Sequence, residues 1–319
     1  MKFFSFYQHR RTFFLISAII MVIGVIGVFI NGVHLDIQFT GGAILKYTYE
    51  GELTGEEVAT AASEILGRLA TGQITKDLTT GESRVVLNLA GEYGMSSDEQ
   101  ADFLVKLNER FPSAKFVSAE SSLVQPFFGR RFLERSILAV VLALFLILIY
   151  EWITFRKIGG LLAGLAALVA LFHDLLVVFF TCVIAGIPIG DSFVAVSLSI
   201  VGYSINATIV IFDRIRENRR LHPKESLETV ADLSMRQSMM RSINTNLAVT
   251  VSVALIYFLA TRASLDSVIA FALPMTFGSI SGCYTSTCLA GPLWVIWQKQ
   301  RDKRRGEAAS AKKAEPAKA

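Results

Sequence analysis

The sequence predicts an α-helical membrane protein that crosses the bilayer six times and carries one α+β domain between its first and second spans. Hydrophobic residues fill 52% of the 319 positions, charged residues fill 18%, and the mean hydropathy is +0.49. A soluble domain carries about 25% charged residues. The apolar residues are bunched in runs of about twenty, which is long enough to cross a bilayer. This pattern excludes a soluble enzyme, a disordered chain and a disulfide-rich secreted scaffold, since all three cysteines lie within apolar runs.

Six apolar stretches qualify as transmembrane helices and divide the chain into segments. The predicted spans are residues 13–30, 133–153, 158–185, 192–212, 239–259 and 267–297. Residues 1–12 precede the first span, residues 31–130 form the soluble domain, residues 131–298 hold the last five helices, and residues 299–319 form a tail. The first apolar run is too long for a signal peptide and lacks a small-residue cleavage site, so we expect an uncleaved anchor.

The distribution of basic residues predicts that both termini lie in the cytoplasm. Lys2, Arg10 and Arg11, then Arg156 and Lys157, then seven basic residues in 214–241 and eight in 299–318 all fall on one side of the six spans. Positive residues concentrate in cytoplasmic loops. Arg130, Arg131 and Arg135 oppose this assignment, but they end a long translocated domain, where charge has little influence.

Residues 31–130 show the pattern of a split βαβ domain. Alternating apolar residues predict a strand at 43–49, and two capping boxes, Thr54 to Glu57 and Ser96 to Glu99, predict helix starts. A hairpin is predicted from residues 73–78 and 84–89, turning near residues 80–82, and a last strand from residues 115–121. The order βαββαβ is that of the ferredoxin-like fold, which we expect to lie outside the cytoplasm. This fold alone indicates no function.

The tail at residues 299–319 is rich in Lys, Arg, Ala and Glu and has no apolar period. Such a composition predicts a disordered basic segment near anionic lipid or ribosomal RNA. The alternative is a solvated segment that only fixes topology.

Two ionisable residues, His173 and Asp174, fall near the middle of the third span, roughly 20 Å from either end. Ionisable groups at this depth are costly and mark functional sites by default, although a buried pair that only fixes helix packing is the alternative. A metal site is not expected, because no second His or Cys cluster occurs at ligand spacing.

The fourth and fifth spans carry further polar residues. Ser199, Tyr203, Asn206 and Asp213 follow at helical spacing and predict one polar face on the fourth span. Asp213 lies beside Arg214 and Arg216, where a salt bridge and a functional role are both open. Arg241 opens the fifth span and has two interpretations, a functional cation or a side chain that extends to the lipid headgroups.

Small residues recur every fourth position in the sixth span, at Gly278, Gly282, Ser286 and Ala290, and Gly160 and Gly164 repeat the spacing in the third. This spacing predicts close helix packing, with sliding surfaces as the alternative. The sequence contains no recognisable nucleophile motif, phosphate-binding loop or metal motif. We therefore expect neither an enzyme nor a cofactor.

Four motifs resemble those of SecF, in the SecD/SecF family of protein-export membrane proteins, which is related to the resistance-nodulation-division transporters. They are residues 201–218, beginning Val-Gly-Tyr-Ser-Ile-Asn, residues 36–42, the His173 and Asp174 pair, and residues 241–245. The resemblance covers residues 10–297. The residues that match motif positions are Asp36, Gly41, Gly42, Gly202, Tyr203, Ser204, Asn206, Asp213, Arg214 and Arg241. The candidates for a proton relay or for coupling are His173, Asp174, Asn206 and Arg241.

This resemblance implies a multi-pass protein of the bacterial cytoplasmic membrane that forms a heterodimer with SecD on the SecYEG channel, often with YidC. In that family the outer domains are thought to grip the emerging preprotein, and proton flow through the helices drives their movement. ATP is consumed by the separate motor SecA, so the resemblance implies no nucleotide site. Protein export driven by the proton motive force is therefore the expected function.

One position departs from the family pattern. The residue after Asn206 is usually Asp, the family's candidate proton carrier, and here it is Ala207, which cannot bind a proton. Three explanations are open: Asp174 takes over the proton relay, SecD supplies the only proton path, or the chain is an uncoupled or substituted variant. Asp174 is the best remaining carrier, because a neighbouring His exchanges protons near neutral pH. The competing functions are a non-conducting scaffold for SecD and the channel, and a half-sized lipid or drug exporter.

Overall fold

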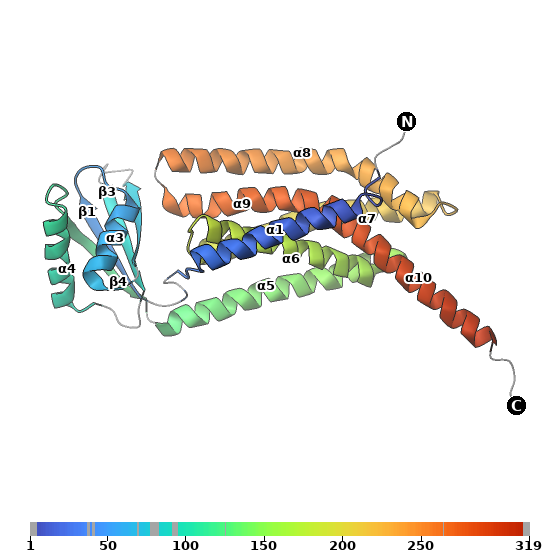
Figure 1. Cartoon of the computed structure of the whole chain (residues 1–319), viewed down its shortest axis with the longest axis horizontal. Helices are drawn as coiled ribbons and strands as arrows, with labels where there is room; N and C mark the ends of the chain where they lie inside the picture. Colours follow the sequence, from blue (N-terminus) through green and yellow to red (C-terminus); the bar gives the residue numbers. More distant parts are fainter. Residues whose placement is uncertain are drawn as a thin grey trace, which may run out of the picture.

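The fold consists of a helical bundle with a small α/β domain at one end (Figure 1). The computed structural model describes residues 5–36, 39, 42–68, 70–76, 83–90, 95–124, 126–263 and 265–314. Helix α1 begins, and α10 extends outward, at the end of the bundle that is remote from the domain. Within the described residues, six helical segments are long and apolar enough to cross a membrane, in agreement with the predicted number of spans.

In the described part of the chain, seven helices and one π-helical turn build the bundle. They are α1 (Arg10–Asn31), α5 (Pro126–Thr154), α6 (Gly160–Ile184), α7 (Asp191–Leu221), α8 (Leu227–Arg262), α9 (Asp266–Thr285), the π-helical turn η2 (Ser286–Ala290) and α10 (Gly291–Ala314). A short 3-10 helix, η1 (Arg156–Ile158), joins α5 to α6. The sixth span passes from α9 through η2 into α10.

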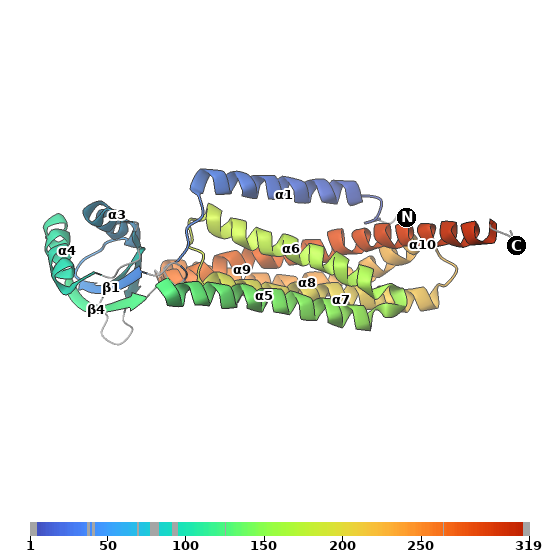
Figure 2. The ribbon, with the colours of Figure 1, turned by 90° about the horizontal axis from the view of Figure 1, so that it is seen from below.

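The helices divide into an inner and an outer group. In the apolar 18-residue segment of each helix, half of the residues of α6 and α7 are buried, against 11% for α1 and α8 and 6% for α5. Viewed from below, α1 lies at the edge of the bundle, against α6 (Figure 2). The outer helices therefore present apolar side chains away from the chain, as lipid-facing helices do. The core is centred on α6, α7 and α9.

The described residues of the domain form four strands and two helices. They are β1 (Gly42–Tyr49), α3 (Gly55–Leu66), β2 (Ala70–Lys76), β3 (Ser83–Ala90), α4 (Ser97–Arg110) and β4 (Val117–Val124). The sheet order is β2-β3-β1-β4, and every neighbouring pair is antiparallel. Leu45 of β1 faces Leu87 of β3, and both pack with Val58 of α3 and Phe103 of α4 in one apolar core. The order of elements is the predicted βαββαβ.

Both predicted capping boxes are present. The Thr54 hydroxyl accepts from the Glu57 amide and the Glu57 carboxylate accepts from the Thr54 amide, and Ser96 and Glu99 repeat this pattern. Hydrogen bonds from the Thr54 backbone and side chain lower the pKa of Glu57. The α3 helix ends at Leu66 because Gly67 adopts a left-handed conformation, so β2 begins at Ala70, earlier than predicted. Leu69 and the predicted turn at residues 80–82 lie outside the described residues.

The tail differs from the expectation of disorder. Helix α10 continues to Ala314, and the last five residues lie outside the described part. Ala, Lys, Arg, Gln and Glu are strong helix formers, and Lys303 pairs with Glu307 one turn further on. A composition that cannot form an apolar core still allows a single extended helix.

Candidate functional site

Asp174 lies at the centre of the bundle on α6. Asp174 is fully buried, with 0% of its surface exposed. It lies about 21 Å along the helix from Gly160 and about 15 Å from Ile184. The helix can occupy the middle of the bundle because its buried face is built from small residues, including Ala163, Ala167 and Ala170. A carboxyl group at this depth requires partners within the protein.

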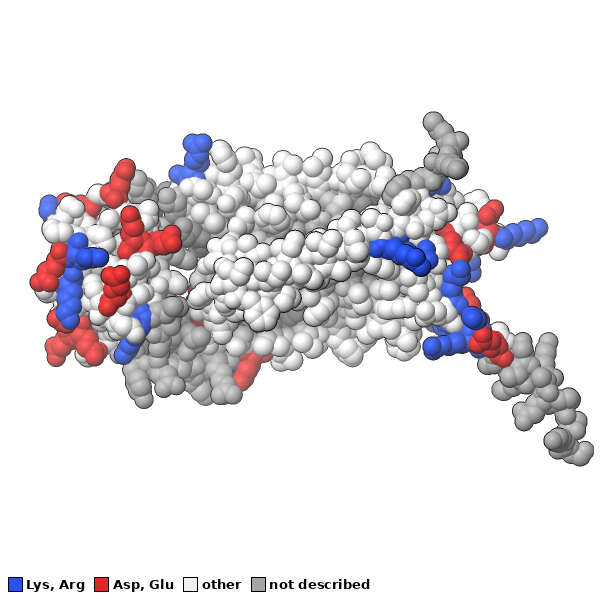
Figure 3. Space-filling model, in the orientation of Figure 1, with Lys and Arg blue, Asp and Glu red and all other residues white. Residues whose placement is uncertain are grey.

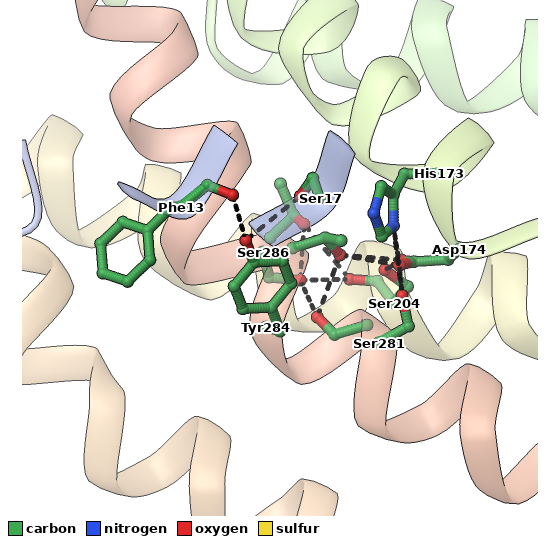
Figure 4. Close-up of polar contacts among 11 residues, drawn as sticks. Phe13, Ser17, His173, Asp174, Ser204, Ser281, Tyr284 and Ser286 are labelled. Atoms are coloured by element: carbon green, nitrogen blue, oxygen red, sulfur yellow. Dashed lines mark hydrogen bonds and ion pairs between the residues drawn. The ribbon is translucent and has the colours of Figure 1, made fainter. Parts of the chain in front are cut away.

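Three hydroxyl groups from two other helices donate hydrogen bonds to Asp174 (Figure 4). Ser204 Oγ of α7 lies 2.7 Å from Oδ2, and Ser281 Oγ of α9 lies 2.6 Å from Oδ1. Thr285 Oγ1 of α9 lies 3.0 Å from Oδ1 and 2.9 Å from Oδ2. Hydroxyl donors to a carboxylate form strong charge-assisted bonds. The site therefore joins α6, α7 and α9 around one buried carboxyl group.

His173 extends this network by one step. Its Nδ1 lies 3.3 Å from Ser281 Oγ and 3.7 Å from Asp174 Oδ1. Ser281 has one hydroxyl proton, which it donates to Asp174, so the imidazole must donate Nδ1–H to Ser281. The His173 Nε2 is buried and has no hydrogen-bond partner among the described residues. In this tautomer Nε2 carries the lone pair, and it is free to accept a proton.

Tyr284 connects the site to α1. Its hydroxyl donates to the Phe13 carbonyl oxygen at 2.6 Å and contacts Ser17 Oγ at 3.1 Å, and its ring centroid is 6.3 Å from that of His173. Because the Tyr284 proton is used on Phe13, the Ser17 hydroxyl is the donor in the second contact. The outer helix α1 is thereby attached to the helix that supplies Ser281 and Thr285.

The small residues of α9 allow this close approach. A Cβ on Gly282 would lie 3.2 Å from Ser204 Oγ, and one on Gly278 would lie 2.7 Å from Val178 Cγ2. Ser286 opens the π-helical turn and donates to the Gly282 carbonyl at 2.7 Å, while Thr208 donates to Ser286 Oγ at 3.0 Å. The small-residue stripe thus packs closely, and the π turn lies beside the candidate site, as such turns often do.

The other two predicted relay residues lie elsewhere. Asn206 and Arg241 are exposed on α7 and α8, and within the described ranges no contact joins either of them to Asp174. Ala207 is buried at 7% exposure on α7. The structure therefore brings together His173, Asp174 and Ser204 but leaves Asn206 and Arg241 on the surface of this chain.

The remaining motif residues of α7 have separate positions. Gly202 is exposed with no atom within 4 Å of an added Cβ, and the Tyr203 hydroxyl is buried without a partner in the part of the chain described. Asp213 pairs with Arg216. Arg214 pairs with Glu217 and donates from Nε to Gln237 of α8 at 2.7 Å, which joins α7 to α8.

The motif at residues 36–42 lies where the chain leaves α1. The Asp36 amide donates to the Ile189 carbonyl at 3.0 Å, so this segment pairs with the loop between α6 and α7. A Cβ on Gly190 would lie 2.8 Å from Asp36 Cβ. Gly42 starts β1 at φ +152°, a conformation that favours glycine. Gly41 lies outside the described residues.

Sequence reasoning missed four polar residues of the bundle: Ser281, Tyr284, Thr285 and Glu151. The first three lie on α9, the helix that carries the predicted stripe of small residues. Only the structure shows that they face Asp174 or α1. Glu151 of α5 is 0% exposed, and neither carboxyl oxygen has a partner among the described residues. Its signal was a single acid at the end of an apolar run.

These features define a polytopic membrane protein whose central helices surround a buried, hydrogen-bonded carboxyl group. The family model described as "Protein export membrane protein SecD/SecF, C-terminal" matches residues 105–300. The chain is 35% identical to the protein translocase subunit SecF of Acidaminococcus fermentans over 302 residues, covering 94% of this chain and 99% of that one. It is 32% identical to the same subunit of Thermobaculum terrenum, covering 91% and 93%. The chain belongs to the SecD/SecF protein-export family.

Solved structures agree with this assignment. The crystal structure of SecDF, a translocon-associated membrane protein from Thermus thermophilus, superposes with a TM-score of 0.71 at 26% identity over 93% of this chain. SecDF in a super-membrane-facing form superposes with a TM-score of 0.68 at 25% identity over 96% of this chain. The chain spans about two fifths of those SecDF chains, 39% and 40% respectively.

Proposed function

We propose that this chain is the SecF-type subunit of a Sec translocase accessory complex that uses the proton motive force to promote late preprotein translocation. Its relatives over nearly their full length are translocase subunits named SecF. The solved structures with the same fold are SecDF proteins, which favours SecD as the partner. These names weigh against a half-sized lipid or drug exporter.

The observation that carries the coupling mechanism is the burial of Asp174 among hydroxyl donors from α7 and α9. An ionised Asp174 accepts from all three hydroxyls and draws the helices together. A protonated Asp174 becomes a donor at one oxygen and loses part of this capacity. Proton binding therefore disfavours the arrangement of the three helices. A proton can bias two conformations only through such a difference in affinity.

His173 provides a route by which the proton reaches Asp174. A proton binds at Nε2, the Nδ1 proton passes to Ser281 Oγ, and the Ser281 proton passes to Asp174. Each step follows a contact of the described network, at 3.3 Å and 2.6 Å. This route replaces the carboxylate that Ala207 lacks. Asn206 and Arg241 are exposed, and in this proposal they face SecD instead of the relay.

The remaining assignments complete the proposal. The βαββαβ domain is a ferredoxin-like domain outside the cytoplasm of a bacterial cell, and both termini are cytoplasmic. Lys and Arg side chains gather at the end of the bundle remote from the domain, as the positive-inside rule requires (Figure 3). The chain acts without enzymatic chemistry or a cofactor. Its complex works on unfolded preprotein with SecYEG, YidC and SecA.

The test is preprotein translocation driven by the proton motive force in vesicles that contain this chain with SecD and the channel. We compare the unchanged chain with Asp174→Asn and Ala207→Asp. Asp191→Asn is the matched control, because it makes the same chemical change at an exposed carboxyl group at the start of α7. The proposal expects a response to the gradient in the unchanged chain and the control, and its loss in Asp174→Asn.

Two other outcomes have defined meanings. A response that appears only in Ala207→Asp would show that the given chain is uncoupled. A response that is unaffected by all three substitutions would place the proton path in SecD and leave this chain as a scaffold. Either result would contradict the role proposed for Asp174.

A further inference from the structure

A strongly basic cavity lies at the end of the bundle where Lys and Arg side chains gather (Figure 3). Its volume is about 260 Å³. The 3-10 turn η1, the end of α7 and helix α10 each supply cations to its wall. These cations are Lys157, Arg216, Arg219, Arg220 and Arg301. A second hollow of about 270 Å³ shares Lys157, Arg216 and Arg220 and adds Arg156.

Most of this positive charge has no counter-charge within the chain. Among the residues that the structure describes, no acidic side chain lines either hollow. Arg216 pairs with Asp213, and Arg301 Nε lies 3.9 Å from an Asp302 oxygen. Throughout the described ranges, Lys157, Arg219 and Arg220 form no ion pair. Converging cations without counter-charges favour the binding of an anion.

Trp294 supplies a buried donor to the same cavity. It is 1% exposed, packs edge to face against Phe212 at 6.0 Å, and its Nε1 has no hydrogen-bond partner in the part of the chain described. The indole nitrogen can only donate, and a buried donor without an acceptor is costly. Arg301 Nε lacks a hydrogen-bond acceptor in the same way. An anionic oxygen in the cavity would satisfy these donors.

The position of the cavity favours a lipid as the source of this anion. Ile153 lines the second hollow and is 62% exposed, and its neighbour Trp152 is 54% exposed. The second hollow, which shares three cations with the first, thus adjoins the exposed apolar end of α5. Basic pockets at helix ends bind phosphate headgroups while the acyl chains lie along the adjoining apolar surface.

We propose that this cavity binds the phosphate headgroup of an anionic phospholipid. Arg219, Arg220 and Lys157 neutralise the phosphate, Trp294 Nε1 donates to one of its oxygens, and the acyl chains lie against the end of α5. The proposal does not depend on the role of Asp174, since none of the residues that line the cavity belongs to the hydrogen-bond network of Asp174.

The test is native mass spectrometry of the full chain titrated with phosphatidylglycerol and, separately, with phosphatidylcholine. One variant combines Lys157→Gln, Arg219→Gln and Arg220→Gln. The matched control combines Lys303→Gln, Arg304→Gln and Arg305→Gln, which removes the same charge from exposed positions of α10 outside the cavity. Trp294→Phe removes the indole donor and keeps an aromatic ring. Circular dichroism verifies that each variant is folded.

We expect the cavity variant to weaken phosphatidylglycerol binding by about tenfold or more and the control by about twofold or less. Trp294→Phe should weaken it by about threefold or more, because a hydrogen bond to a charged group is lost. Equal losses in the two triple variants, or equal binding of both lipids, would overturn the proposal. Displacement of phosphatidylglycerol by millimolar inorganic phosphate would also overturn it, because the ligand would then be free phosphate.

Discussion

The Ser281 hydroxyl on α9 donates a 2.6 Å hydrogen bond to Asp174 Oδ1 on α6, and both residues are buried. The same hydroxyl oxygen lies 3.3 Å from His173 Nδ1. The Ser281 hydroxyl therefore links the His173 imidazole to the Asp174 carboxyl group through hydrogen bonds. It also connects two of the three helices that surround the charge.

Replacement of Ser281 by Ala should destabilise the bundle. A buried carboxylate oxygen loses a donor, and we expect the free energy of unfolding to fall by about 1–3 kcal/mol. Ser252→Ala is the control, because Ser252 is exposed on α8 and donates only to its own helix, to the Ala248 carbonyl. Unfolding by titration with SDS measures the free energy of unfolding of both variants. Equal effects of the two substitutions would show that the Ser281 bond contributes nothing specific.

Replacement of Tyr284 by Phe should loosen α1. The Tyr284 hydroxyl donates to the Phe13 carbonyl and accepts from Ser17, and these bonds join α1 to α9. We expect a loss of about 1 kcal/mol and faster amide hydrogen exchange near Phe13. Tyr150→Phe removes a hydroxyl from a residue that is 51% exposed, and it should leave the exchange unchanged. Unaltered exchange in Tyr284→Phe would contradict this attachment.

Replacement of Gly24 by Ala should separate α1 from α6. A Cβ on Gly24 would overlap Phe180 Cδ2, so the ring or the helix must move. Overpacking of this kind costs about 1–3 kcal/mol. The control is Gly306→Ala in α10, where no atom lies within 4 Å of an added Cβ and Ala should favour the helix. A stable Gly24→Ala chain would show that the two helices pack differently.

Glu151 should tolerate replacement by an apolar residue. Its two carboxyl oxygens are buried without partners among the described residues, an environment that penalises a charge and offers nothing in return. We expect Glu151→Met to raise the free energy of unfolding by about 1 kcal/mol, because a buried unpaired polar group is removed. Glu151→Gln retains a polar group and should change stability little. A large loss of stability in both variants would reveal a functional or structural partner for the carboxyl group.

Much of the fold follows from local sequence patterns. Long apolar runs fix the six spans, and the Thr54 and Ser96 capping boxes fix two helix starts, because these signals act within a few residues. The predicted start of β2 at residue 73 was wrong, because Gly67 ends α3 and the strand already begins at Ala70. The prediction of a disordered tail was wrong, because strong helix formers extend α10 without burying an apolar face.

The site was predictable only in part. His173 and Asp174 stand out because ionisable residues are rare within apolar spans. Ser281 and Thr285 do not, since hydroxyl residues in helices commonly bond their own backbone, as Thr276 does with the Ala272 carbonyl. Which hydroxyl faces the carboxylate depends on how α9 is rotated against α6. Close packing at Gly278 and Gly282 determines that rotation, and a single sequence does not reveal the facing helix.

The most direct test of the central claim is infrared difference spectroscopy of the full chain in vesicles, recorded with and without a proton gradient across the membrane. Subtraction of the Asp174→Asn spectrum assigns the carboxyl band. We predict that the gradient changes this band, and that Ser281→Ala shifts the frequency of the band, because the Ser281 hydroxyl donates a hydrogen bond to Asp174. A carboxyl band that is the same with and without the gradient would contradict the role of Asp174 as the proton-binding group.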